Sequence, residues 1–323
     1  MKKLFKTFAF LGLLSAVSCS KNDNISKDAA QVNEASAAHW GLSGNTVTHD
    51  PTLIQAGSTW WSFSTGQGIG VKYSSDGRNW TQGVQRFPSA LSWWKTYAPN
   101  MTTNDIWAPD IIYRNGRYWL YYSVSSFGSK NSAIGLTSCT SIQNGDWRDD
   151  GLVISSGSNT AYNAIDPDVF VNSDGRVWMT FGSFFDGIQI VELNGTTMKP
   201  TGSVRAIARR SGGIEAPCIV KNGSYYYLFV SIDRCCQGTS STYKIAYGRS
   251  TSITGPYTDR NGGSMLNGAA TVLDAGNTQW RGPGGQDVYR NNIMIRHAYD
   301  ANDNGTPKML ISDLYFSGGW PTY

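Results

Sequence analysis

Three features of the amino-acid sequence predict an all-β, single-domain protein with the architecture of a five-bladed β-propeller. A phrase in which a proline precedes an apolar run recurs with its proline at positions 51, 109, 167 and 217, and residues 285–289 (GQDVY) form a fifth copy without the proline. Each interval holds several short apolar runs. Glycine and aromatic residues are abundant, while charged residues make up only 15% of the chain. Repeats of roughly 50 residues with about four strands each are typical of propeller blades.

The apolar runs follow one order within each interval and predict the strands of one sheet. The phrase opens the first strand, in residues 53–54 and 111–112, and a glycine-containing turn follows it. The second strand is aromatic, as in residues 60–63 (WWSF), 118–122 (YWLYY), 176–181 (RVWMTF) and 225–229 (YYYLF). A third strand is expected near residues 70–73, 133–136 and 244–247, and a last one near residues 77–80 and 145–147. A tandem of immunoglobulin-like domains would need units of about 100 residues and a linker, and neither is visible.

The first 38 residues predict export followed by a tether. Residues 1–18 have a basic start and an apolar core, which is the pattern of a signal peptide. Residues 15–19 (SAVSC) resemble a bacterial lipoprotein cleavage box, in which Cys19 would be acylated, and an ordinary secretory signal cut near Ser18 or Ser20 is the alternative. Residues 19–38 are polar and aperiodic and predict a flexible tether, so the globular domain is expected over residues 39–323. The expected location is the cell envelope, on either face of the outer membrane, or otherwise the medium.

Charge and cysteine spacing argue against several other classes of protein. Of the net charge of +4, three positive charges belong to lysines in the first six residues, so no basic stripe remains and nucleic acid is not expected as a partner. No later apolar run reaches transmembrane length, and membrane contact is expected only through the N-terminal lipid. The four remaining cysteines (139, 218, 235 and 236) lack zinc-site spacing, and buried free thiols are favoured over disulfides. A monomer is expected.

The phrase also positions acidic residues. Asp50 and Asp166 directly precede their prolines, and Glu215 stands two residues before Pro217. In a propeller, the innermost strand of each blade lines the central channel, so equivalent positions of different blades face one another. We therefore expect Asp50, Asp166 and Glu215 to converge at the mouth of the channel.

Converging carboxyl groups are the equipment of glycoside hydrolysis. One acid must hold a proton near neutral pH to protonate the leaving oxygen, and a neighbouring carboxylate and apolar surroundings raise its pKa. Another acid must stay ionised to activate water. A single Asp-Pro pair more often caps a turn, but that role does not explain Glu215 or three acids at related positions.

Four motifs together resemble the arabinanase branch of glycoside hydrolase family 43. They are residues 49–51 (HDP), 107–110 (WAPD), 163–167 (NAIDP) and 213–217 (GIEAP). The resemblance covers residues 40–315 and implies a five-bladed propeller that hydrolyses with inversion. It further implies that Asp50 is the general base, that Glu215 is the general acid, and that Asp166 tunes the pKa of Glu215 and orients it.

The same resemblance implies a set of substrate contacts. Trp107 and Phe127 match aromatic platforms for sugar rings, for which aromatic faces are suited, and packing within the blades is the alternative. Asn163, Ser183 and Phe184 match contacts to the sugar at subsite −1 and to its neighbours. These five residues are therefore expected along the cleft.

An ion site is also implied by the resemblance. His297 matches a histidine that binds calcium or another ion, largely through waters, on the propeller axis near the acids. A buried histidine satisfied by protein partners is the alternative. The pair Cys235-Cys236 matches a loop beside the cleft, for which the resemblance offers no role.

The leading functional hypothesis is an endo-acting α-1,5-L-arabinanase with arabinan and arabino-oligosaccharides as substrates. Exo-acting arabinanases, arabinofuranosidases and β-xylosidases of the same family are alternatives. Such exo-acting relatives commonly carry a C-terminal β-sandwich, and a single propeller without it favours an open groove and internal cleavage. A non-catalytic propeller that binds glycan at the cell surface is a hypothesis of another class, and the three acids argue against it.

Overall fold

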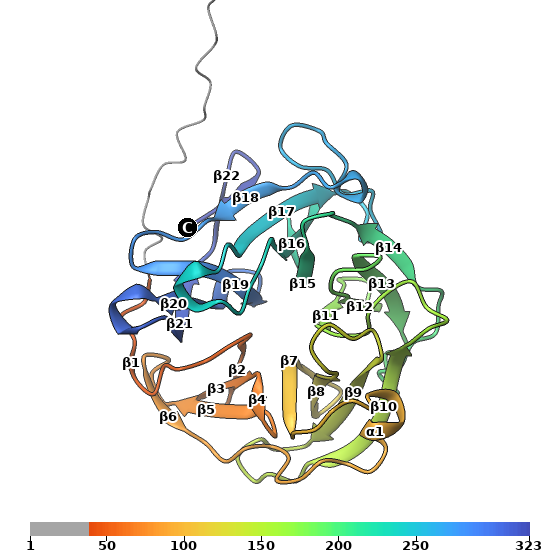
Figure 1. Ribbon diagram of the computed structural model, residues 1–323, viewed down its shortest axis with the longest axis vertical. Helices are drawn as coiled ribbons and strands as arrows, with labels where there is room; N and C mark the ends of the chain where they lie inside the picture. Colours follow the sequence, from red (N-terminus) through yellow and green to blue (C-terminus); the bar gives the residue numbers. More distant parts are fainter. Residues whose placement is uncertain (1–38) are drawn as a thin grey trace, which may run out of the picture. The chain divides into compact units, whose positions relative to one another are not determined.

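The computed structural model describes residues 39–323, in which five sheets surround a central axis and a separate two-stranded hairpin follows the last of them (Figure 1). The five-bladed β-propeller predicted from the repeats is therefore confirmed. The expected signal peptide, the acylated Cys19 and the tether lie outside the described residues. Within residues 39–323, no helix has both the length and the apolar character needed to cross a membrane.

Each of the first four blades is a sheet of four main antiparallel strands, with the first strand nearest the axis (Figure 1). Blade 1 contains β2 (Thr52–Ala56), β3 (Thr59–Ser64), β5 (Gly70–Ser74) and β6 (Asn79–Gln82), with β1 (Ser43–Gly44) parallel to β6. Blade 2 contains β7 (Asp105–Arg114), β8 (Arg117–Val124), β9 (Ser132–Cys139) and β10 (Arg148–Ser156), with β4 (Gly66–Gln67) paired to β7. Blade 3 contains β11 (Asp168–Val171), β12 (Val177–Phe181), β13 (Ile188–Leu193) and β14 (Arg205–Ala208). Blade 4 contains β15 (Ile214–Asn222), β16 (Tyr225–Ile232), β17 (Lys244–Ser250) and β18 (Thr271–Asp274).

Blade 5 contains β19 (Trp280–Tyr289), β20 (Ile293–Asp300) and β21 (Thr306–Asp313). The start of the described chain completes this blade, because the Met309 amide in β21 donates to the Thr46 carbonyl at 2.8 Å and the Thr48 amide donates to the Pro307 carbonyl at 3.0 Å. The ring is thus closed by joining the beginning of the described chain to its last blade. The remaining elements are α1 (Trp94–Tyr97), η1 (Gly238–Ser240), η2 (Met265–Asn267), η3 (Ala301–Asp303) and the hairpin β22 (Tyr315–Ser317) with β23 (Trp320–Thr322).

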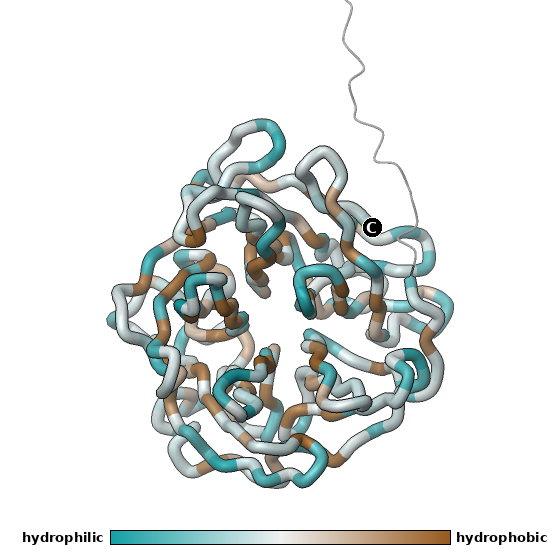
Figure 2. Tube along the Cα trace, turned by 180° about the vertical axis from the view of Figure 1, so that it is seen from behind, coloured by the Kyte–Doolittle hydropathy of each residue, from teal (hydrophilic) through white to brown (hydrophobic). Residues whose placement is uncertain are grey.

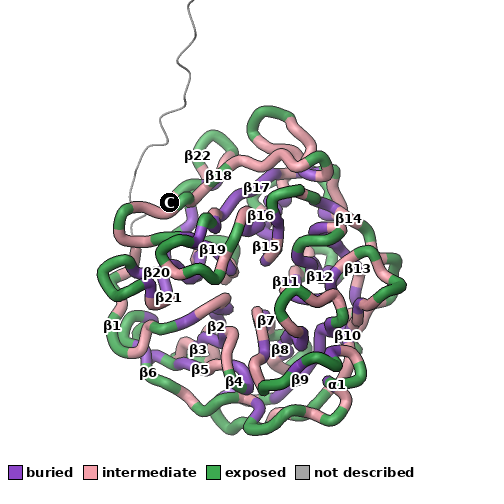
Figure 3. The backbone as a smooth tube through the Cα atoms, in the orientation of Figure 1, coloured by how far each residue is buried: buried purple, intermediate pink, exposed green. Residues whose placement is uncertain are grey.

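The hydrophobic residues gather between neighbouring blades instead of in one central core. Alternate side chains of a strand point to opposite faces of its sheet. In β8, Leu120 and Tyr122 pack toward blade 1, whereas Trp119 and Tyr121 pack toward blade 3. Three further clusters occupy the other blade interfaces. Figures 2 and 3 show hydrophobic, buried segments along the strands and hydrophilic, exposed stretches in the outer loops. Covering both faces of the middle strands explains why their apolar runs are continuous.

The repeated phrase has the same backbone conformation in all five blades. The residue at the position before the proline lies in the left-handed region, with φ of 46° at Asp50, 37° at Ala108, 56° at Asp166, 47° at Ala216 and 55° at Gly285. In β7, β15 and β19 the ladder register shifts at this position, which marks a β-bulge. A bulge redirects the side chains around it. The repeat therefore encodes the turn that brings these residues to the channel mouth.

Two details differ from the expectations. The last strand of blade 2 begins at Arg148, directly after residues 145–147, and Trp147 in this connection packs against the cluster between blades 1 and 2. Cys139 and Cys218 are buried and free, as expected. Cys235 and Cys236 form a disulfide, so the preference for free thiols is wrong for this pair. Its loop is not buried in a blade, and Cys236 has a φ of 66° in the turn where the two side chains meet.

Candidate active site

A groove of about 1010 Å³ opens at one end of the channel, and loops from all five blades line it. Asp50 reaches it from the turn before β2, Asp166 from the turn before β11, and Glu215 from β15. The structure thus brings together three carboxyl groups that are far apart in the sequence. Their differing environments determine the protonation state of each.

Asp50 is held as a carboxylate. Its Oδ2 accepts hydrogen bonds from His49 Nδ1 and from Thr65 Oγ1, each at 2.8 Å. Burial alone would raise the pKa of the Asp50 carboxyl, but the charge of His49, its hydrogen bond and the nearby His297 outweigh burial and lower this pKa. Asp50 therefore stays ionised and able to accept a proton. Gly285 of blade 5 packs directly against its carboxylate, where a Cβ atom would collide with Oδ1.

Glu215 is held at both carboxyl oxygens. Tyr243 Oη donates to Oε1 and Ser183 Oγ donates to Oε2, each at 2.7 Å. Burial raises the pKa of Glu215, the two hydrogen bonds oppose this rise, and the charge of Asp50 adds to it, so that the pKa is raised overall. A carboxyl group with a raised pKa that faces a groove is suited to donate a proton.

Asp166 lies within reach of the charges of both other acids. Its Oδ2 accepts the Ala216 amide at 3.1 Å, which joins blade 3 to blade 4 at the residue that follows Glu215. Burial and the charges of Glu215 and Asp50 raise the pKa of Asp166 well above its usual range. The charge of Glu215 disfavours the ionised form of Asp166, so Asp166 keeps its proton to higher pH than an isolated carboxyl group would.

The five expected substrate contacts all line the groove. The Phe127 side chain is 88% exposed and that of Phe184 is 42% exposed, so neither is used for packing within a blade. Trp107 is partly buried on β7. Asn163 is buried and its Oδ1 accepts a hydrogen bond from Ser132 at 2.7 Å, which fixes the amide. Ser183 Oγ donates to Glu215, so this side chain lies beside the acid.

His297 lies on β20 behind the groove lining and is fully buried. Its ring stacks on that of His49 with centroids 3.7 Å apart, and its Nδ1 accepts the Asp50 amide at 3.1 Å. Burial and the charge of His49 lower the pKa of His297 to about 3, so the ring is neutral. Its Nε2 is buried without a hydrogen-bond partner among residues 39–323. His297, His49 and Asp50 each offer a ligand atom, and these atoms lie within 4.8 Å of one another.

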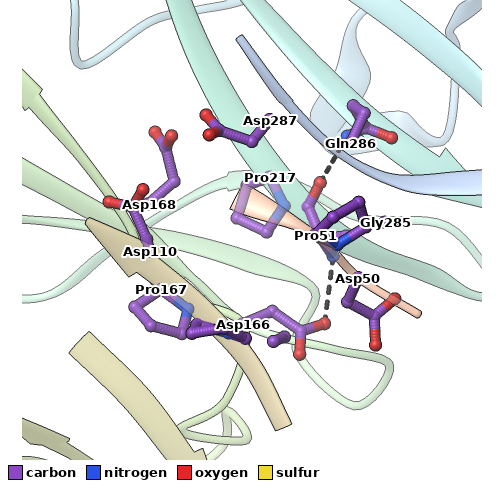
Figure 4. Close-up of a pocket in the computed structure, with 13 residues that line it drawn as sticks. Asp50, Pro51, Asp110, Asp166, Pro167, Asp168, Pro217, Gly285, Gln286 and Asp287 are labelled. Atoms are coloured by element: carbon purple, nitrogen blue, oxygen red, sulfur yellow. Dashed lines mark hydrogen bonds between the residues drawn. The ribbon is translucent and has the colours of Figure 1, made fainter. Parts of the chain in front are cut away.

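A second layer of carboxyl groups lies deeper in the channel, around a cavity of about 30 Å³ (Figure 4). Asp110, Asp168 and Asp287 each stand one residue after the proline position. Each accepts a backbone N–H from the first strand of the next blade, in the pairs Asp110–Val169 (2.8 Å), Asp168–Ile219 (3.0 Å) and Asp287–Leu53 (3.1 Å). Burial and the charge of Asp287 raise the pKa of Asp168 to about 7. These hydrogen bonds therefore join neighbouring blades.

Sequence reasoning missed the residues that hold the acids. Thr65 contacts Asp50, and Tyr243 contacts Glu215. Tyr299 contacts His49. Each of these contacts comes from another strand or another blade. No motif spacing could have identified them, because they come from different repeats or different positions within a repeat. His49 stands beside Asp50 in the sequence, and its polar side chain next to a predicted acid was the one available signal.

The chain is similar in sequence and in fold to known proteins. The model of glycosyl hydrolases family 43 matches residues 44–321. Extracellular endo-α-(1→5)-L-arabinanase 1 of Bacillus subtilis is 57% identical over 296 residues, which cover 90% of this chain and 91% of that protein. Extracellular exo-α-(1→5)-L-arabinofuranosidase ArbA of Cellvibrio japonicus is 38% identical over 296 residues, which cover 84% and 85%. The solved structure of the GH43 endo-arabinanase from Bacillus licheniformis superposes with a TM-score of 0.86 at 57% identity, over 88% of this chain and all of that one.

Proposed function

Because this chain belongs to glycosyl hydrolases family 43, we propose that it is an endo-α-1,5-L-arabinanase that cuts the backbone of arabinan and arabino-oligosaccharides with inversion. The high identity to an endo-arabinanase over nearly the whole length of both chains supports this substrate. The groove supports internal cleavage, because its volume of about 1010 Å³ has room for several sugar residues.

The observation that carries the proposal is the split in ionisation among three acids that share one groove. The pKa of Asp50 is lowered, while those of Asp166 and Glu215 are raised. Hydrolysis with inversion requires one ionised and one protonated carboxyl group on opposite sides of the scissile bond. In our assignment Asp50 is the general base, Glu215 is the general acid and Asp166 tunes the pKa of Glu215.

The reaction consumes one water and leaves two new hydroxyl groups, one on the anomeric carbon and one at O5 of the leaving arabinose, and exchange of protons with solvent afterwards restores ionised Asp50 and protonated Glu215. Asp50 takes a proton from water as the water oxygen attacks the anomeric carbon of the sugar in subsite −1. The bond from that carbon to O5 of the next arabinose breaks, and Glu215 gives its proton to this oxygen. Asp166 raises the pKa of Glu215 so that the proton is present near neutral pH. Trp107, Phe127 and Phe184 would pack against sugar rings, and Asn163 and Ser183 would contact the sugar beside the acid.

A product-size time course on linear, debranched arabinan tests the proposal. An endo-acting enzyme gives a mixture of oligosaccharides at early times, whereas an exo-acting one gives a single short product. The Glu215→Gln variant, which keeps the shape of the side chain, should lose about 100-fold to 10,000-fold in rate, which is the usual contribution of a general acid. Binding without any release of sugar by the unaltered protein would favour the glycan-binding alternative.

The 38% identical exo-acting relative is the reason to keep a second candidate. Groove loops that close one end would convert internal cleavage into release from a chain end. Early appearance of one short product would favour this reading and would leave the roles of the three acids unchanged.

Calcium or another cation near His297 is part of the proposal. The buried, unpartnered Nε2 of His297 suits a contact with an ion or with a water in its shell. Calcium prefers oxygen ligands, so most of its ligands here would be waters and binding would be modest. When bound, the ion would supply positive charge that favours the ionised form of Asp50. Calorimetric titration of calcium into chelator-treated protein should give binding that His297→Ala removes, and equal binding by both proteins would contradict the site.

Export and anchoring are proposed from the N-terminal sequence. The extracellular relative supports export. We further propose that Cys19 carries the lipid, that the polar stretch after it acts as the tether, and that the protein is a monomer. Labelled fatty acid should be incorporated into the natural protein and not into Cys19→Ser, and light scattering of the unacylated variant should give the mass of one chain. Release of unlabelled natural protein into the medium would favour the secretory signal.

A further inference from the structure

The loop between β16 and β17 contacts the side-chain network of Asp50. Within this loop, the Cys236 amide donates to Tyr299 Oη at 2.9 Å. Tyr299 belongs to β20 of blade 5, and its Oη lies 2.8 Å from His49 Nε2. The charged ring of His49 donates from Nε2 to Tyr299 Oη, which accepts the Cys236 amide as well. The loop of blade 4 is thereby connected to the histidine that holds Asp50.

The hydrogen bonds to the Asp50 carboxylate determine which of its oxygens can act as a base. His49 Nδ1 and Thr65 Oγ1 both donate to Oδ2, each at 2.8 Å. Oδ1 accepts no hydrogen bond from the described residues, and its neighbour His297 Nδ1, 3.4 Å away, is itself an acceptor for the Asp50 amide. Oδ1 is therefore the oxygen left for the attacking water. A rotation of His49 would release Oδ2 and misdirect Oδ1.

The loop is built to hold one conformation. Cys236 has a φ of 66°, in the left-handed region that side-chain-bearing residues rarely adopt. The covalent bond between Cys235 and Cys236 closes the turn at this residue. On either side, the Gln237 amide donates to Ser241 Oγ at 2.9 Å and the Thr242 amide donates to the Arg234 carbonyl at 3.0 Å. The direction of the Cys236 N–H is thus fixed by the turn and not by solvent.

We propose that the Cys235–Cys236 turn and Tyr299 are positioning elements for the general base, acting on Asp50 through His49. Nothing in the turn needs to touch the reacting atoms. The inference rests on the proposed function, since it assigns Asp50 the role of base in arabinan hydrolysis. It gives the disulfide a role in the chemical step as well as in the groove wall.

A double-mutant cycle tests the chain of contacts. The variants are Tyr299→Phe, which removes only the hydroxyl, the pair Cys235→Ser with Cys236→Ser, and all three changes together. Tyr227→Phe is the matched control, because Tyr227 Oη donates to the Gly319 carbonyl at 2.7 Å, away from the groove. Steady-state kinetics on linear arabinan give kcat and KM for each variant, and thermal unfolding reports stability.

The proposal expects kcat to fall about tenfold in Tyr299→Phe and in the serine pair, with KM within about twofold, since misorientation of a catalytic group costs rate and not binding. It also expects the combined variant to be no slower than Tyr299→Phe alone, because both changes break the same chain. Tyr227→Phe should keep full kcat.

Two results would overturn the inference. One is an unchanged kcat in Tyr299→Phe. The other is a combined variant whose loss is the product of the two separate losses, which would mean that the turn acts elsewhere in the groove. Failure of the natural protein to release sugar from arabinan would count against the proposed function instead, so the two failures are distinguishable.

Discussion

Replacing Tyr243 by phenylalanine should move the alkaline limb of the pH–rate profile to higher pH. Tyr243 Oη donates to Glu215 Oε1 at 2.7 Å, and this hydrogen bond favours the ionised form of the carboxyl group. A hydrogen bond to a charged group contributes roughly 1.5–3 kcal/mol, compared with about 1 kcal/mol for a neutral one. Its removal therefore disfavours ionisation by roughly 1–2 kcal/mol. Since about 1.4 kcal/mol corresponds to one pKa unit, the pKa of Glu215 should rise by about one unit.

The sign follows from the role of Glu215 as proton donor. The acid works only when protonated, so a higher pKa keeps it active to higher pH. Profiles of kcat/KM on linear arabino-oligosaccharides report the pKa of the free enzyme, and Tyr227→Phe again serves as the matched control. Tyr243 itself stays protonated throughout, because burial raises its pKa well above 10. An alkaline limb that stays in place or moves to lower pH would refute the assignment of Glu215 as the acid held by Tyr243.

Three further predictions concern the groove, the acid and the deeper carboxyl layer. Phe127→Ala should raise KM for arabinan roughly fivefold to tenfold with little change in kcat, as expected for loss of one aromatic contact of about 1 kcal/mol, and an unchanged KM would remove Phe127 from the binding surface. Ser183→Ala should shift the alkaline limb in the same direction as Tyr243→Phe, and an opposite shift would contradict the hydrogen bond to Glu215. The raised pKa of Asp168, about 7, means that the folded state holds a proton which the unfolded chain releases near pH 4, so stability should fall as pH rises from about 4 to 7. Melting temperatures of Asp168→Asn should decline less over this range than those of the unaltered protein, and parallel curves would contradict the shift.

The parts of the fold that repeat could be predicted, because each repeat solves the same packing problem. The position of the proline phrase predicted the first strand of every blade, and blade symmetry predicted that Asp50 and Asp166 occupy equivalent places. Gly285 occupies that place in blade 5. The sequence alone therefore predicted that different blades place a carboxylate at the same position. The one-residue offset of Glu215 was visible as a departure from the repeat.

The parts that do not repeat could not be predicted from spacing. Tyr243 and Tyr299 reach the acids from strands of blades 4 and 5, and only the closed ring brings them there. The disulfide between Cys235 and Cys236 was not predicted, because adjacent cysteines pair only in a turn with an unusual backbone conformation. The sequence contains no pattern that indicates such a turn. Helix α1 lies in the long connection between β6 and β7, where no periodic pattern extends far enough to mark it.

The anomeric configuration of the first product tests the central claim most directly. The claim is that Asp50 activates water while Glu215 protonates the leaving oxygen, so that a single displacement occurs at the anomeric carbon. Proton NMR of a short α-1,5-arabino-oligosaccharide treated with a high concentration of the protein should show the β anomer at the new reducing end before mutarotation. Initial appearance of the α anomer would mean two displacements through a covalent intermediate and would contradict the assignment of the three acids.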